Sequence, residues 1–173
     1  MASSAKSGGD FLARKSDLNR LKPELPALKD ILVVDDETFD ADRLKATLRV
    51  MFGYDVELRR AATVASAVDQ VLKKQPELIF LDDQLKPSDT ASVSIPYLRR
   101  AEYHGPIVVI SGAVTRNRRK ELISIGAAEV IHKDDVDSSR LAEALLNVYA
   151  PAALAAATPP ASAKRDEKPK RDE

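Results

Sequence analysis

The feature that most constrains the fold is a series of short apolar runs that recur between segments with helical spacing. The runs "ILVVD" (31–35), "ELIFLD" (77–82) and "PIVVIS" (106–111) are rich in β-branched residues and too short for ordinary helices. Continuous apolar runs of this kind predict strands that are buried on both faces. Two less apolar strands are expected at 54–61 and 128–132.

Segments with helical spacing of apolar residues separate these strands. They are expected over 37–53, 64–75, 95–103, 115–127 and 138–149. One buried face of the first helix is predicted from Phe39, Leu44, Leu48 and Met51. Gly53 is expected to end this helix, Thr63 to cap the next, and Pro96 to lie in the first turn of the third.

The alternation of strands and helices predicts the fold class. It indicates an α/β fold in which helices cover both faces of a parallel sheet. Because the crossovers between parallel strands are right-handed, few topologies remain. A doubly wound, three-layer αβα arrangement is expected.

Composition divides the 173 residues into three parts. The regular pattern covers 29–149, which we expect to form one domain. Residues 1–28 are expected to be a flexible leader, in which the spacing of Phe11, Leu18, Leu21, Leu25 and Leu28 allows a short helix. Residues 150–173 contain small residues, prolines and two copies of "KRDE", and are predicted to be a disordered tail.

Charge and cysteine content limit the function. The 27 basic and 27 acidic residues cancel, so no net charge favours nucleic acid or an anionic membrane. The absence of cysteine excludes disulfides, thiolate catalysis and cysteine metal sites. No apolar stretch has the length of a signal peptide or a membrane span, so a cytoplasmic protein is expected.

Polar residues stand at the carboxyl ends of the predicted strands. They are Asp35, Asp36, Asp82, Asp83, Ser111 and Lys133. Ligands of doubly wound sheets bind at this edge. Converging carboxylates repel one another unless a cation lies among them, and Mg²⁺ suits oxygen ligands. A carboxylate also accepts phosphoryl groups as a nucleophile, with lysine and hydroxyl groups stabilising the transferred oxygens. The set therefore predicts phosphoryl transfer onto a protein carboxylate.

Four motifs together resemble the receiver domain of bacterial two-component response regulators. They are "ILVVDDE", "PELIFLDDQL", "VVISG" and "GAAEVIHKDD", and the resemblance covers about residues 29–149. It implies a flavodoxin-like fold with five parallel strands in the order 2-1-3-4-5.

The resemblance also implies a Mg²⁺ site. By position in the motifs, Asp36 matches the direct ligand, and Asp35 matches the aspartate that holds the ion largely through water. Asp82 and the backbone carbonyl of Gln84 match the remaining protein ligands.

The implied phosphoacceptor is Asp82, with Ser111 as the switch hydroxyl and Lys133 as the lysine that bridges to the phosphoryl group. The implied function is a stand-alone response regulator, which takes a phosphoryl group from a sensor histidine kinase or a histidine phosphotransfer protein. It then signals through contacts with a downstream effector protein. Such a protein is a phosphoacceptor rather than an enzyme, although it promotes its own phosphorylation and slow hydrolysis. No DNA-binding module is expected in 150–173, and a monomer or a homodimer is expected.

Four positions depart from the family pattern. Asp83 is charged where a neutral residue is usual, so it either influences Mg²⁺ and the phosphodonor or points to solvent. Pro87 lies one position later than usual, in a long serine-rich loop. Val130 replaces the aromatic switch of many receivers, so output is expected to take another route. Asp134 replaces a proline, which puts the usual cis peptide bond there in doubt.

Other interpretations remain open. The basic residues Arg116, Arg118, Arg119 and Lys120 form either a solvated face or a docking surface for an acidic partner. The domain as a whole is alternatively a receiver-like interaction module that is never phosphorylated. A third alternative is an aspartyl-nucleophile phosphohydrolase, but these enzymes usually carry a DxD motif that "VVDDE" lacks.

Overall fold

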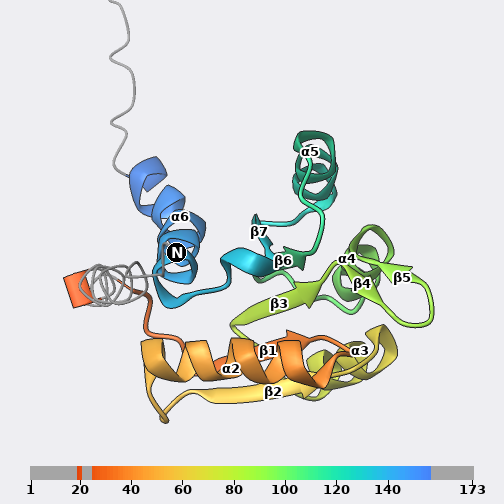
Figure 1. Cartoon of the computed structure of the whole chain (residues 1–173), viewed down its shortest axis with the longest axis horizontal. Helices are drawn as coiled ribbons and strands as arrows, with labels where there is room; N and C mark the ends of the chain where they lie inside the picture. The colour runs from red at the N-terminus through yellow and green to blue at the C-terminus, as the bar shows by residue number, and fades with distance from the viewer. Residues whose placement is uncertain (1–18, 21–24, 157–173) are drawn as a thin grey trace, which may run out of the picture.

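The computed structural model describes residues 19–20 and 25–156, and its centre is a parallel sheet (Figure 1). The strands are β1 (Asp30–Val34), β2 (Glu57–Ala61), β3 (Leu78–Asp82), β6 (Ile107–Ser111) and β7 (Glu129–His132). Their order is β2-β1-β3-β6-β7, with every neighbouring pair parallel. The predicted order 2-1-3-4-5 is therefore confirmed.

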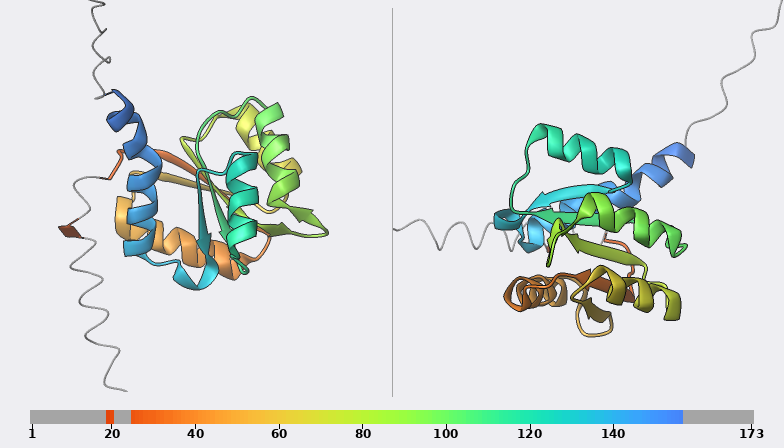
Figure 2. Two further views of the ribbon diagram at one scale, coloured as in Figure 1. Left: turned by 90° about the horizontal axis from the view of Figure 1, so that it is seen from above. Right: turned by 90° about the vertical axis from the view of Figure 1, so that its right-hand side faces the viewer.

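Helices cover both faces of this sheet, as the alternation predicted. They are α2 (Thr38–Phe52), α3 (Val64–Lys73), α4 (Ala91–Arg100), α5 (Arg116–Ile125) and α6 (Ser138–Ala156). In the left view of Figure 2, α2 and α6 lie on one side and α4 and α5 on the other. Alternate residues of β1 serve the two layers, because Leu32 packs with α3, α4 and α5 while Ile31 packs with α2 and α6.

The strand register brings the polar residues to one edge. Val34 is level with Leu81, so Asp35 follows β1 at the level where Asp82 ends β3. Asp82 is in turn level with Ile110, so Asp83 stands beside Ser111, and the Asp83 amide donates to the Ile110 carbonyl at 2.9 Å. Because side chains alternate along a strand, Asp82 and Asp83 face opposite layers of the fold.

Local signals for helix ends are confirmed. The Thr63 hydroxyl caps α3 by accepting from the Ser66 amide at 3.1 Å. Gly53 ends α2 with φ of 77°, a conformation that a glycine adopts without steric cost.

The predicted buried face of α2 is wrong at Phe39, which is 77% exposed. Ala41 occupies the buried position instead, in line with Leu44, Leu48 and Met51. Phe39 lies two residues from Ala41, which at 3.6 residues per turn is about 200° around the helix.

The segment before Pro96 is also different from the prediction. It contains a short antiparallel hairpin of β4 (Gln84–Leu85) and β5 (Asp89–Thr90), and then α4 begins at Ala91. Pro96 therefore lies inside the helix rather than in its first turn, where it removes one backbone hydrogen bond. The buried residues Ala91 and Ser94 are too small or too polar to have indicated this first turn.

The expected domain limits shift at both ends. The last helix, α6, continues past Tyr149 to Ala156, so the boundary expected at 149/150 falls inside it. Leu25 and Leu28, from the expected leader, pack partly buried against the cluster of α2 and α6. The rest of the predicted leader helix and of the predicted tail lies outside the described residues.

Candidate functional site

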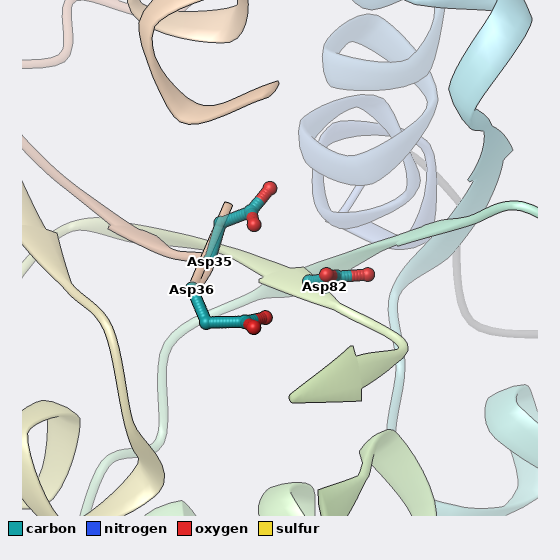
Figure 3. Close-up of side chains that lie close together, drawn as sticks. All are labelled: Asp35, Asp36 and Asp82. Atoms are coloured by element: carbon teal, nitrogen blue, oxygen red, sulfur yellow. The ribbon is translucent and has the colours of Figure 1, made fainter. Parts of the chain in front are cut away.

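Three carboxylates meet beyond the sheet edge. Asp35 and Asp36 follow β1, and Asp82 ends β3 (Figure 3). One oxygen from each lies within 4.8 Å of the other two. The parallel register produces this arrangement, since it places the end of β1 level with the end of β3.

Burial and mutual repulsion raise the pKa values of two of these carboxyls. Burial, followed by the charge of Asp82, raises the pKa of Asp35 to about 6, although the Glu37 amide donates to it at 2.8 Å. Burial also raises the pKa of Asp82, against the Gln84 amide and Lys133. Both shifts show that negative charge is costly here without a cation.

The donor set fits a hard divalent cation. Three carboxylates within reach of one point supply the oxygen ligands that Mg²⁺ takes, and the cation would relieve the repulsion among them. Gln84, whose carbonyl the sequence predicted as a further ligand, begins β4 and lines the same pockets as Asp82. Its role as a ligand stays a prediction.

Lys133 comes to Asp82 from the end of β7. Its Nζ lies 3.4 Å from Asp82 Oδ2 and 3.1 Å from Asp40 Oδ2. Burial opposes the charged form, but the hydrogen bond to Asp40 and the charge of Asp82 outweigh it and raise the pKa of Lys133. Arg43 Nη2 donates to the Lys133 carbonyl at 2.7 Å, which holds this turn against α2. Neither Asp40 nor Arg43 was predicted from the sequence.

A second lysine, Lys86, reaches the cluster from the β4–β5 hairpin. It forms an ion pair with Glu37, and its Nζ lies 3.8 Å from Asp36 Oδ2. With Asp82 and Gln84 it lines a pocket of about 430 Å³. Lys86 could not be predicted from the sequence, because a single lysine in a loop of unpredicted conformation carries no signal.

The Asp83 side chain does not point to solvent, so the interpretation of Asp83 as a solvent-exposed residue is wrong. It is 5% exposed, and it forms an ion pair with Arg118 of α5. It also accepts a hydrogen bond from the Ser111 hydroxyl at 2.9 Å. It is absent from the cluster of three carboxylates because strand alternation turns it toward the other layer.

Ser111 faces a smaller pocket of about 170 Å³ between these groups. Asp82, Asp83 and Lys133 line the same pocket. The Ser111 side chain is buried. It shares this pocket with Asp82, which contacts Lys133, and with Asp83, which pairs with Arg118. Two of the predicted site residues, Asp82 and Lys133, are therefore in contact, and Ser111 lies beside them.

Two residues of the basic segment have acidic partners within the fold. Arg118 pairs with Asp83, while Arg119 pairs with Glu129 and donates to the Val130 carbonyl at 2.8 Å. Val130 itself is buried in the core. The Lys133–Asp134 peptide bond is not cis; within the part of the chain that the structure describes, the cis bond is at Lys86–Pro87.

Comparison with known proteins identifies the family. The profile of the response regulator receiver domain matches residues 31–146, so the chain belongs to the receiver domain family of response regulators. No curated protein matches the sequence. Within residues 19–20 and 25–156, we find no helix with the length and apolar character that a membrane span requires.

Solved structures show the same fold. NtrX from Brucella abortus is 27% identical with a TM-score of 0.62, over 75% of this chain and 29% of that chain. A Burkholderia pseudomallei response regulator with a phosphorylated aspartic acid, calcium ion and citrate is 22% identical, with a TM-score of 0.60 over 76% of this chain and 75% of that one. The BeF3-activated receiver domain of Klebsiella pneumoniae RstA is 21% identical, with a TM-score of 0.59 over 70% and 99%.

Proposed function

We propose that this receiver domain accepts a phosphoryl group on Asp82 from the phosphohistidine of a sensor histidine kinase or a histidine phosphotransfer protein. The observation that carries the proposal is the position of the Asp82 carboxylate. It belongs to the three-carboxylate cluster, lies 3.4 Å from the Lys133 ammonium, and lines the pockets of about 430 Å³ and 170 Å³. A donor phosphoryl group therefore has access to it from the larger pocket of about 430 Å³.

The transfer is a displacement at phosphorus. An Asp82 carboxylate oxygen attacks, the new O–P bond forms as the P–N bond breaks, and the electron pair leaves with the donor imidazole. Lys133 neutralises charge on the transferred oxygens, and the Ser111 hydroxyl donates a hydrogen bond to one of them. Bound Mg²⁺ would be held by Asp35, Asp36, Asp82 and the Gln84 carbonyl, and would neutralise further charge on the phosphoryl group. The phosphorylated aspartic acid and calcium ion of the Burkholderia pseudomallei protein support this assignment by analogy.

The phosphorylated form then changes the affinity of the domain for an effector protein, in the cytoplasm, and no nucleic acid or membrane contact is required. Slow hydrolysis of the acyl phosphate resets the domain. The balance of 27 basic and 27 acidic residues supports a protein partner rather than nucleic acid.

Intact-mass measurement after incubation with acetyl phosphate and Mg²⁺ tests this function. We expect one phosphoryl adduct on the wild type, which a chelator prevents and which hydroxylamine removes, because an acyl phosphate is sensitive to that nucleophile. Asp82→Asn is the matched variant and acquires no adduct. Phosphoramidate, whose P–N bond resembles that of phosphohistidine, serves as a second donor. An adduct that persists in Asp82→Asn, or none on the wild type from either donor, contradicts the proposal.

A further inference from the structure

The buried carboxylate of Asp83 accepts a hydrogen bond from the Ser111 hydroxyl. The proposed function requires the same hydroxyl to donate to the phosphoryl group on Asp82. We propose that Asp83 is a positioning residue, which competes with the phosphoryl group for the Ser111 hydroxyl and is itself fixed by Arg118. The inference rests on the proposed function, because the competitor is a phosphoryl group on Asp82. It assigns a role to a charge that is unusual for the family.

The competition follows from the single hydrogen of a serine hydroxyl. Ser111 Oγ lies 2.9 Å from Asp83 Oδ2 and 3.4 Å from the Ala113 carbonyl, so Asp83 is the better acceptor. A hydroxyl has one proton to donate, and hydrogen bonds to a carboxylate are stronger than those to a neutral oxygen. Ser111 therefore releases Asp83 before it donates to a phosphoryl oxygen.

Arg118 keeps Asp83 in place. Its Nη2 pairs with Asp83 Oδ1, and its Nε donates to Oδ2 at 3.2 Å, so the guanidinium holds both carboxylate oxygens. Its Nη1 contacts Ser92 Oγ at 2.8 Å and Glu121 Oε2 at 2.9 Å, which ties the guanidinium to α4 and α5. Asp83 therefore stays in place when the Ser111 hydroxyl turns toward Asp82. Only the serine side chain moves when the hydroxyl changes its acceptor.

The path for the exchange is short. Asp82, Asp83 and Ser111 line one pocket of about 170 Å³. Because both acceptors border the pocket that Ser111 faces, we expect the exchange to need rotation of the serine side chain between staggered rotamers, without a move of the sheet.

A double-mutant cycle on the rate of adduct formation tests the competition. With acetyl phosphate and Mg²⁺, we expect Asp83→Asn to accept the phosphoryl group about tenfold faster than the wild type, which corresponds to the loss of one charge-assisted hydrogen bond. In the Ser111→Ala background the same substitution should give only the smaller acceleration that follows from removing one negative charge, since no hydroxyl remains to be released. The cycle isolates this coupling because Ser111→Ala removes the donor hydroxyl and Asp83→Asn removes the charge of its acceptor.

The cycle also distinguishes release of the Ser111 hydroxyl from a general effect of removing one negative charge near Asp82. Removing a carboxylate near Asp82 reduces repulsion of an anionic donor, but that effect is independent of Ser111. Asp89→Asn, which makes the same charge change on the rim of the larger pocket, is the matched control, and its effect should be equal in both serine backgrounds. An acceleration by Asp83→Asn that is equal in both backgrounds, or no acceleration at all, overturns the proposal.

The same four proteins, unfolded by urea without any phosphodonor, report whether the contact exists. We expect the losses of stability to be non-additive, because both substitutions affect one hydrogen bond. Coupling in unfolding without coupling in rate means that the contact is structural only, and the proposal is then overturned while the proposed function stands. A wild type that accepts no phosphoryl group overturns both, but the unfolding cycle would still show coupling, so the two failures are distinguishable.

Discussion

Asp82 and Asp83 are neighbours of the same residue type with nearly equal exposure, 4% and 5%, but their surroundings are opposite. Asp82 meets two other carboxylates, has Lys133 at 3.4 Å, and borders open pockets. Asp83 is held through both oxygens by the guanidinium of Arg118 and accepts from Ser111. Asp82 therefore borders open space beside two like charges, whereas both oxygens of Asp83 are engaged by partners within the fold.

The comparison shows that burial alone does not define a reactive carboxylate. Burial and nearby carboxylates raise the pKa of Asp82, which makes the site receptive to a cation or to covalent neutralisation. The hydrogen bond to Asp83 raises the pKa of Arg118, so the contact favours the charged guanidinium. Strand alternation creates the difference, because it sends adjacent side chains to layers with different partners.

Among these tests, removal of the Arg118 guanidinium should cause the largest loss of stability, because Asp83 then loses the partner that distinguishes it from Asp82. Arg118→Met leaves a buried carboxylate without its cation, and we expect a loss of about 3 kcal/mol in the free energy of unfolding, measured by urea denaturation. The matched control is Arg116→Met on the exposed side of the same helix, with an expected change within about 0.5 kcal/mol. If the two variants were equally stable, Asp83 would not depend on Arg118.

The effect of Mg²⁺ on the free energy of unfolding should also distinguish the site of Asp82 from that of Asp83, by a smaller amount. At ten times its dissociation constant, Mg²⁺ should raise the free energy of unfolding of the wild type by about 1.4 kcal/mol, because it binds the folded cluster. Asp36→Asn should lose this increment and Asp83→Asn should keep it. Loss of the Mg²⁺ effect in Asp83→Asn would place Asp83 in the metal site, contrary to the geometry.

Ser92 supplies the finest test of how Arg118 is held. Ser92→Ala removes the acceptor of the 2.8 Å contact from Arg118 Nη1. We expect a loss of about 0.5 kcal/mol in urea unfolding, since Glu121 remains as a partner. Ser88→Ala, at an exposed serine of the hairpin, is the control and should change nothing measurable. A loss above that of Arg118→Met would contradict the assignment of Arg118 as the main partner of Asp83.

Much of the fold was predictable because its main signal is local. Apolar runs such as Leu78–Leu81 mark strands buried on both faces, and caps such as Thr63 mark helix ends. The carboxyl edge of a parallel sheet then brings Asp35 and Asp82 together whatever the details of packing.

The remaining features depend on contacts across the sequence. The partner of Asp83 is Arg118 on α5, which the sequence separates widely from it, so only the folded arrangement of β3 and α5 reveals the pair. Lys86 reaches Asp36 only because the hairpin folds back over the site. The start of α4 at Ala91 was missed because small buried residues give a weak periodic signal.

The most direct test of the account is to identify which of the two adjacent aspartates carries the phosphoryl group in the wild-type protein. After incubation with acetyl phosphate and Mg²⁺, borohydride reduces the phosphorylated side chain to homoserine, and tandem mass spectrometry of the peptide that contains both residues locates it. The account predicts homoserine at position 82 and an unchanged Asp83. Homoserine in place of Asp83 would contradict it, because the carboxylate paired with Arg118 would then be the reactive one.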